Sequence, residues 1–135
     1  MNYHETPIDV RWGDLDMLGH VNNVAYLTYY EQARVDTIYH IGSLSGEAGV
    51  GCVVVQANVS YKVSVEYPAT LKVVTSIQKI GNTSMIFHHT LRDRDGDTVY
   101  SEADVTVVWV DRKQGGGPVS VPDFVRAWAQ GQPGS

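Results

Sequence analysis

The side chains best suited to chemistry gather in one segment, residues 11–23, which reads RWGDLDMLGHVNN. Asp14 and Asp16 are followed by His20 and then by Asn22, a residue type that caps helices. The first N–H groups of a helix have no partner within it and lie at the positive end of its dipole, so they can stabilise an oxyanion. A carboxylate just before such a start is a candidate nucleophile or general base. The competing interpretation is that these residues only close a turn and cap the helix.

Other familiar catalytic patterns are incomplete. Residues 42–46 (GSLSG) have leucine where a nucleophile elbow needs serine. Cys52 opens an apolar run, which favours core packing over a reactive thiolate. His88 and His89 are neighbours on a predicted strand, so they face opposite sides and cannot chelate one metal ion together. Residues 115–117 (GGG) lack the lysine and the following helix of a phosphate loop. We predict neither a metal nor a cofactor.

Composition indicates an ordinary globular chain of 135 residues, with 43% hydrophobic residues. We expect one domain over residues 1–135, with a core at about 6–129 and a flexible tail at 130–135. One cysteine excludes an internal disulfide. A net charge of -5 without a lysine or arginine cluster argues against a nucleic-acid partner. The absence of an apolar leader and of a long apolar run predicts no membrane span and a cytoplasmic location.

Alternation of apolar and polar residues predicts five strands. The pattern covers residues 8–12, 53–63, 71–77, 85–91 and 99–109. In the second of these, the odd-numbered positions are expected to form the buried face. Tight turns at Gly81-Asn82 and Asp95-Gly96 join the last three strands, which predicts an antiparallel meander.

One long helix is predicted from about Asn23 to Ile41, ending at Gly42. Its expected buried arc consists of apolar residues at helical spacing, namely Val24, Leu27, Tyr30, Val35, Ile38 and Ile41. Glu31 and Arg34 fall inside this arc, which favours a buried ion pair or, for Glu31, a position near the water that Asp16 would activate. A second, short helix is expected at 122–129. The order of elements is typical of an α+β fold in which the long helix covers the sheet.

The central motif resembles a known family of enzymes. It consists of RWGDLD at 11–16 and GHVNN at 19–23, followed by Tyr26 and by YE and AR at 30–31 and 33–34. These residues resemble hotdog-fold acyl-CoA thioesterases of the 4-hydroxybenzoyl-CoA thioesterase and YbgC-like group, and the stretch is similar to plant acyl-carrier-protein thioesterases. The resemblance extends from about Ile8 to Trp128.

The resemblance implies a hotdog fold, in which a curved antiparallel sheet wraps a long central helix and the active sites lie at a dimer interface. It implies that Asp16 is the catalytic carboxylate, as nucleophile or general base, and that the backbone N–H of Asn23 polarises the thioester carbonyl. His20 and Glu31 would be supporting residues. Two departures are visible, because YbgC-like members often carry histidine at Asn23 and plant enzymes carry asparagine at Leu18.

We therefore expect hydrolysis of an acyl-CoA thioester to a free acid and CoA by a homodimer or homotetramer. The alternatives are a non-catalytic hotdog domain that binds acyl thioesters or a protein, and an acyl-carrier-protein thioesterase. The residues expected to bind substrate are Tyr26, Arg92, Arg94, Arg112 and Lys113, the last four through the phosphates of CoA.

Overall fold

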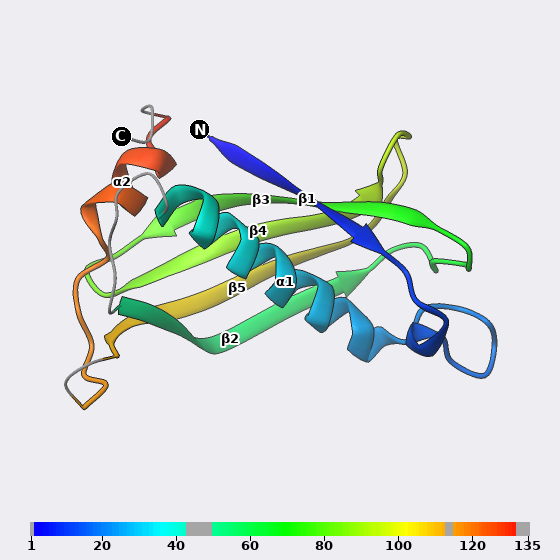
Figure 1. Ribbon diagram of the computed structural model, residues 1–135, viewed down its shortest axis with the longest axis horizontal. Helices are drawn as coiled ribbons and strands as arrows, with labels where there is room; N and C mark the ends of the chain where they lie inside the picture. The colour runs from blue at the N-terminus through cyan, green and yellow to red at the C-terminus, as the bar shows by residue number, and fades with distance from the viewer. Residues whose placement is uncertain (1, 43–49, 113–114, 132–135) are drawn as a thin grey trace.

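The computed structural model describes residues 2–42, 50–112 and 115–131. Five antiparallel strands form one sheet in the order β1-β3-β4-β5-β2, and the long helix α1 lies across one of its faces (Figure 1). The strands are β1 (Tyr3–Asp9), β2 (Val50–Tyr61), β3 (Thr70–Ile80), β4 (Ser84–Asp93) and β5 (Val99–Asp111). The helices are the short 3-10 helix η1 (Trp12–Asp14), α1 (Asn23–Gly42) and α2 (Asp123–Ala129). This confirms the α+β class, the meander and both predicted helices.

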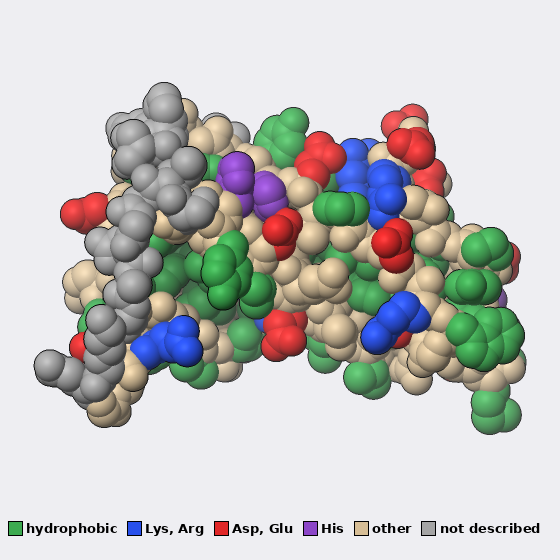
Figure 2. Space-filling model, in the orientation of Figure 1, with side chains coloured by type: hydrophobic (Ala, Val, Ile, Leu, Met, Phe, Trp, Pro, Cys, Tyr) green, Lys and Arg blue, Asp and Glu red, His purple; other side chains and the backbone are tan. Residues whose placement is uncertain are grey.

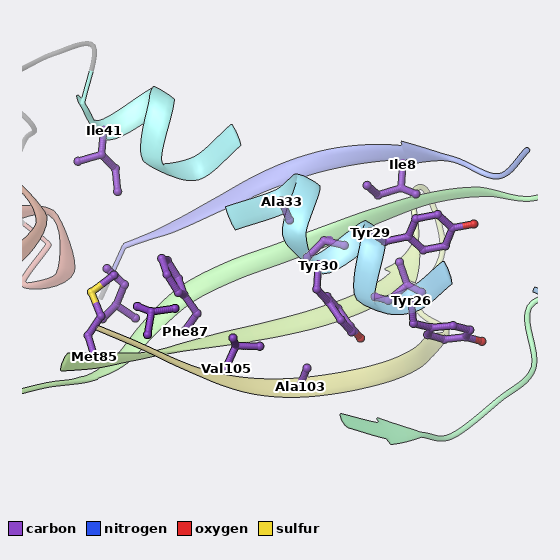
Figure 3. Packing of buried hydrophobic residues seen from close by; sticks show 14 of the residues in the cluster. Ile8, Tyr26, Tyr29, Tyr30, Ala33, Ile41, Met85, Phe87, Ala103 and Val105 are labelled. Carbon is purple, nitrogen blue, oxygen red and sulfur yellow. The ribbon is translucent and has the colours of Figure 1, made fainter. Parts of the chain in front are cut away.

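Helix α1 begins where the sequence predicts, because the side-chain oxygen of Asn22 accepts a hydrogen bond from the N–H of Val24 at 3.1 Å. Its predicted buried arc is half right, since Tyr30 and Ile41 are buried and Ile38 is partly buried against the core. The side chains that face the sheet are Tyr26, Tyr29, Tyr30, Ala33, Thr37 and Ile41 (Figure 3). Val24, Leu27 and Val35 are exposed instead. Tyrosines can be buried here because their hydroxyls find partners in the core, so α1 keeps a second apolar face.

The first strand ends earlier than predicted. It stops at Asp9, and Trp12 begins η1 with its side chain 75% exposed. The carboxylate of Asp14 accepts a hydrogen bond from the N–H of Arg11 at 3.0 Å, which favours a tight turn over continued strand.

Strand β2 is an edge strand, and its predicted buried face is only partly confirmed. Its register against β5 shifts between Val54 and Gln56, so Val54 lies opposite the buried Val107 before the shift, whereas Ala57 and Val59 lie opposite the buried Val105 and Ala103 after it. The odd-numbered positions therefore share the core-facing side only after the shift, and along the open edge Val53, Val54 and Val55 are 52%, 45% and 60% exposed. The strand contains neither proline nor a charged residue, whereas β1, at the other edge, carries Pro7. Edges that stay unpaired are normally protected by such residues.

His89 is a fully buried polar residue within the core. Its ring stacks against Tyr30 and Phe87, with centroids 5.2 and 5.7 Å away, and its Nδ1 lies 2.9 Å from the hydroxyl of Thr75. Burial, with the nearby charge of Arg34, lowers the pKa of His89 to about 3. Its neighbour in the chain faces the other side of the sheet, as predicted.

Burial of His89 predicts a loss of stability in mild acid. The folded protein holds the ring neutral, while the unfolded chain binds a proton below about pH 6.5. The free energy of unfolding should therefore fall by roughly 1 kcal/mol per pH unit between pH 6 and 4. In melting curves across this range, His89→Phe should flatten the slope. Equal slopes in wild type and His89→Phe would contradict the assignment.

Candidate active site

The segment between η1 and α1 is a closed loop that holds Asp16 at the surface. Leu15 and Val21 form a bridge across its base, and the N–H of Asp16 donates to the carbonyl of His20 at 2.8 Å. One carboxylate oxygen of Asp16 accepts hydrogen bonds from the N–H groups of Leu18 at 2.8 Å and His20 at 3.2 Å. The side chain is thus orientated by its own loop while remaining exposed.

Asp14 is the buried anchor of this loop. Its carboxylate accepts hydrogen bonds from the hydroxyl of Tyr29 at 2.7 Å and from the guanidinium of Arg11 at 3.0 Å. Burial acts to raise the pKa of Asp14, but these bonds and the one from the Arg11 N–H outweigh it and hold the pKa below its usual value. Burial and the bond to Asp14 raise the pKa of Tyr29. Asp14 is therefore a structural residue.

The first turn of α1 follows directly. Asn23 is the first residue of the helix, so no carbonyl of an earlier helical turn is present to accept a hydrogen bond from its N–H. Its carbonyl accepts a hydrogen bond from the hydroxyl of Tyr61 at 3.2 Å. The N–H of Asn22 donates to the carbonyl of Asp14 at 2.8 Å, which joins the loop to the helix start. The arrangement can offer a carboxylate and an oxyanion donor within one short segment.

His20 supports the loop on its other side. It pairs with Glu66 as an isolated bridge, and its Nε2 lies 3.6 Å from the Glu66 carboxylate. Its backbone also forms two of the three hydrogen bonds of Asp16 described above, because its carbonyl accepts from the Asp16 N–H and its N–H donates to the Asp16 carboxylate. The structure therefore places His20 beside Asp16, as predicted, but through its main chain, with its ring turned towards Glu66.

Apolar side chains surround the loop. Met17 and Leu18 are 101% and 78% exposed, and the ring of Trp12 meets that of Tyr67 edge-on with centroids 5.8 Å apart. Figure 2 shows hydrophobic side chains gathered at this end of the molecule. We call these four residues the apolar rim. Exposed apolar groups beside a carboxylate are suited to a substrate that is itself largely apolar.

Two predicted site residues lie elsewhere. Glu31 is exposed on α1, eight residues beyond Asn23 and thus about 12 Å further along the helix axis. It also forms no ion pair with Arg34 among the described residues, so the expected buried pair is wrong. Tyr26 is buried against Tyr61, with ring centroids 4.9 Å apart. It packs in the core rather than facing a substrate.

The predicted phosphate-binding cations do not form one cluster within a single chain. Arg94 donates hydrogen bonds to the carbonyls of Ile8 and Leu71 and pairs with Asp9, so it fastens the sheet. Arg92 lies beside the start of β5 and Arg112 follows its end, on the order of 40 Å away at about 3.3 Å per residue. Lys113 lies outside the described residues.

Sequence reasoning missed three contributors to this site. Tyr29, Tyr61 and Glu66 come from distant parts of the chain and reach the loop only through folding. Tyr29 carried one usable signal, since a tyrosine on the buried side of a helix needs a hydrogen-bond acceptor.

Metal and thiol chemistry find little support in the described part of the chain. No group of three or more His, Cys, Asp or Glu residues is placed there to hold a metal ion. Cys52 is half-buried, and burial raises the pKa of its thiol, which agrees with its predicted packing role. No helix of the described residues is long and apolar enough to cross a bilayer.

Comparison with known proteins identifies the family. Residues 10–129 match the sequence model of the thioesterase-like superfamily. The long-chain acyl-CoA thioesterase FadM of Escherichia coli is 29% identical over 81% of this chain and 84% of its own length. The acyl-CoA thioester hydrolase YbgC of Escherichia coli O6:H1 is 30% identical over 78% and 80%. A solved structure, the putative thioesterase PA2801 of Pseudomonas aeruginosa, is 36% identical with a TM-score of 0.82 over 93% of this chain and 96% of that one. The chain therefore belongs to the thioesterase-like superfamily and has its hotdog fold.

Proposed function

We propose that this protein hydrolyses an acyl-CoA thioester to a free acid and CoA. The observation that carries the proposal is the exposed carboxylate of Asp16, held by two N–H groups of its own loop shortly before Asn23, the first residue of α1. Asp16 acts as nucleophile or general base, and the N–H of Asn23 stabilises the oxyanion. His20 keeps Asp16 in place through its backbone.

Thioester chemistry suits so small a set of groups. As a base, Asp16 takes a proton from water while the oxygen of that water attacks the carbonyl carbon. As a nucleophile, its own oxygen attacks, and water then cleaves the resulting anhydride. In both routes the carbon–sulfur bond breaks and the thiolate leaves with its electron pair. A thiol with a pKa of about 8.5 leaves without strong general-acid assistance.

The apolar rim and the named relatives support an acyl substrate. Trp12, Met17, Leu18 and Tyr67 would cover the acyl or pantetheine part beside Asp16. The relatives FadM and YbgC carry acyl-CoA in their names. The test is a panel of acyl-CoA and acyl-carrier-protein thioesters of varied chain length, including aromatic acyl groups, with free thiol as the readout. Turnover of at least one acyl-CoA supports the proposal, whereas turnover of carrier-protein thioesters alone would replace the substrate class.

The proposal includes a homodimer built on β2. This edge is long and uncharged, and Val53, Val54 and Val55 are all about half exposed or more, at 52%, 45% and 60%. Antiparallel pairing of two β2 strands would continue the sheet and bury these residues. It would also place the first residues of one β2 beside the last residues of the other. Arg112 packs over Gly51, so the partner subunit's Arg112 would come near Tyr61 and the start of α1.

A phosphate contact by the partner subunit's Arg112 predicts salt-sensitive substrate binding. In wild type, raising the salt concentration from 50 to 500 mM, roughly, should increase KM for acyl-CoA several-fold with a smaller effect on kcat. Arg112→Ala should raise KM at low salt and weaken this response. Arg94→Ala is no suitable control, because it would loosen the sheet; Lys79→Ala, on an exposed part of β3, serves instead. A salt response unchanged in Arg112→Ala would remove Arg112 from the site.

A further inference from the structure

An open groove lies between β1 and α1, at the edge of the sheet opposite β2. Its volume of about 390 Å³ is within the range of small-molecule sites. Asp36, in this groove, is thirteen residues beyond Asn23 and thus about 20 Å further along the helix axis. The groove is therefore separate from the loop that carries Asp16. Two residues of β1 and four of α1 line it, namely Thr6, Pro7, Gln32, Val35, Asp36 and Tyr39.

Asp36 gives the groove a fixed negative charge. Its Oδ2 accepts hydrogen bonds from the hydroxyl of Thr6 at 2.7 Å and from Nε2 of His4 at 2.8 Å. Burial acts to raise the pKa of Asp36, but these bonds outweigh it and hold the pKa below its usual value. The second oxygen, Oδ1, accepts no hydrogen bond from the described residues. Because the side chain is 46% exposed, this oxygen is open to a donor from solution.

Apolar surface adjoins this carboxylate. Val35 and Tyr39 are 48% and 73% exposed. Tyr39 follows Asp36 by three residues, so the two side chains are neighbours on the helix surface, with Cβ atoms about 5–6 Å apart. The face of an aromatic ring attracts a cation, and the ring also covers alkyl carbons. The groove thus combines one anion, one aromatic ring and aliphatic surface from Val35 and Pro7.

The charges around the groove decide which kind of ligand it suits. Asp36 is the one acid among its lining residues, and neither lysine nor arginine is among them. His4 stacks on His40 with ring centroids 4.5 Å apart, and these rings form the histidine pair seen in Figure 2. The net charge of -5 also repels anions at long range. A phosphate or a carboxylate is therefore a poor occupant, whereas a cation that carries alkyl carbons is complementary.

We propose that this groove is a binding site for small organic cations, in which Asp36 pairs with an ammonium group while Tyr39 and Val35 cover the attached alkyl carbons. The amide oxygen of Gln32, one turn before Asp36, is a second acceptor. Because Thr6 and His4 already hold the carboxylate, little side-chain freedom is lost when a ligand binds. The site goes beyond thioester hydrolysis and shares no residue with the proposed active site.

The probe for this site is n-butylammonium, added to the full chain at about pH 8, where an alkylammonium is charged and an imidazole is ordinarily neutral. In NMR spectra we expect saturable shifts of the backbone amide signals of Thr6, Asp36 and Tyr39. The Kd should be in the millimolar range, as befits so small a molecule. The comparison ligand is n-butanol, which has the same number of heavy atoms and no charge. It should bind about tenfold more weakly.

Two substitutions test the two parts of the site. Asp36→Asn removes the charge but keeps an oxygen that can accept the Thr6 hydroxyl, and it should weaken n-butylammonium binding at least about tenfold. Tyr39→Leu removes the ring and leaves the bonds between β1 and α1 intact, and it should weaken binding several-fold. The matched controls are Asp97→Asn, on an exposed turn, and Tyr3→Leu, on the other face of β1. Both should bind like wild type.

Three results would overturn the proposal. The first is the absence of saturable shifts at these amides. The second is equal affinity for n-butylammonium and n-butanol, which would make the groove merely apolar. The third is wild-type affinity in Tyr39→Leu or in a folded Asp36→Asn. If Asp36→Asn loses the native spectrum, Tyr39→Leu and the two ligands still decide the question. None of these measurements uses acyl-CoA, so the proposed function stands or falls separately.

Discussion

Replacing Asp16 with asparagine is expected to lower kcat for acyl-CoA hydrolysis at least about a hundredfold, the loss typical of a positioned proton-transfer group. The amide oxygen can still accept the N–H groups of Leu18 and His20, so the loop should keep its shape. Only the charge and the ability to accept a proton or attack carbon are removed. The melting temperature and the affinity for acyl-CoA should therefore stay close to wild type.

The matched control is Asp97→Asn, the same change on an exposed turn between β4 and β5. It should leave kcat, KM and melting temperature unchanged. Asp14 is unsuitable as a control, because its carboxylate is buried and carries the loop. If Asp16→Asn lowered the melting temperature and its loss of activity followed from that loss of stability, Asp16 would be a turn residue only.

Asp14→Ala is expected to give the largest loss of stability. It removes the acceptor for Arg11 and for the hydroxyl of Tyr29, which would be left unpaired in the core. Lost hydrogen bonds of this kind cost about 3 kcal/mol together, which corresponds to a fall in melting temperature of about 10 °C for a chain of this size. Activity should fall with it, since Asp14 supports the loop that carries Asp16.

Tyr29→Phe provides the graded comparison. It removes one of the bonds to Asp14 and should cost about 1 kcal/mol. Because the folded protein holds the pKa of Asp14 below its usual value, the contribution of Asp14 is complete above about pH 4 and is lost as the pH falls through the lowered pKa. Thermal melting of both variants at pH 7, where the contribution of Asp14 is complete, would test the two expected losses of stability. A stable Asp14→Ala would contradict the buried-anchor role.

Much of the fold follows from local sequence patterns. The cap at Asn22, the turn glycines and the alternation in β3 to β5 depend only on nearby residues, and the structure confirms those elements. The burial of α1 does not depend on nearby residues alone. The face with Val24 and the face with Tyr29 are both apolar enough to be buried. The Tyr29 face is buried because its tyrosine hydroxyls find hydrogen-bond partners 15 and 71 residues away in the chain.

The site shows the same division. The order of Asp16, His20 and Asn23 within one segment was visible in the sequence, because a short loop keeps neighbours together. The sequence did not show whether Glu31 joins them, because the distance of Glu31 from Asn23 depends on the helix turns between the two residues and not on their sharing a motif. The positions of Arg92 and Arg112 at opposite ends of β5 likewise emerge only from strand register. The contribution of a second chain proposed above would leave no signal in local spacing.

The central claim is that this protein turns over acyl thioesters at Asp16. The most direct measurement counts the thiols released per chain when wild type and Asp16→Asn are each given an acyl-CoA that both bind with equal affinity. The account predicts many thiols per wild-type chain and, in the same time, at most about one hundredth as many from Asp16→Asn. It would be contradicted by a wild type that binds acyl-CoA without releasing thiol, or by equal release from the two proteins.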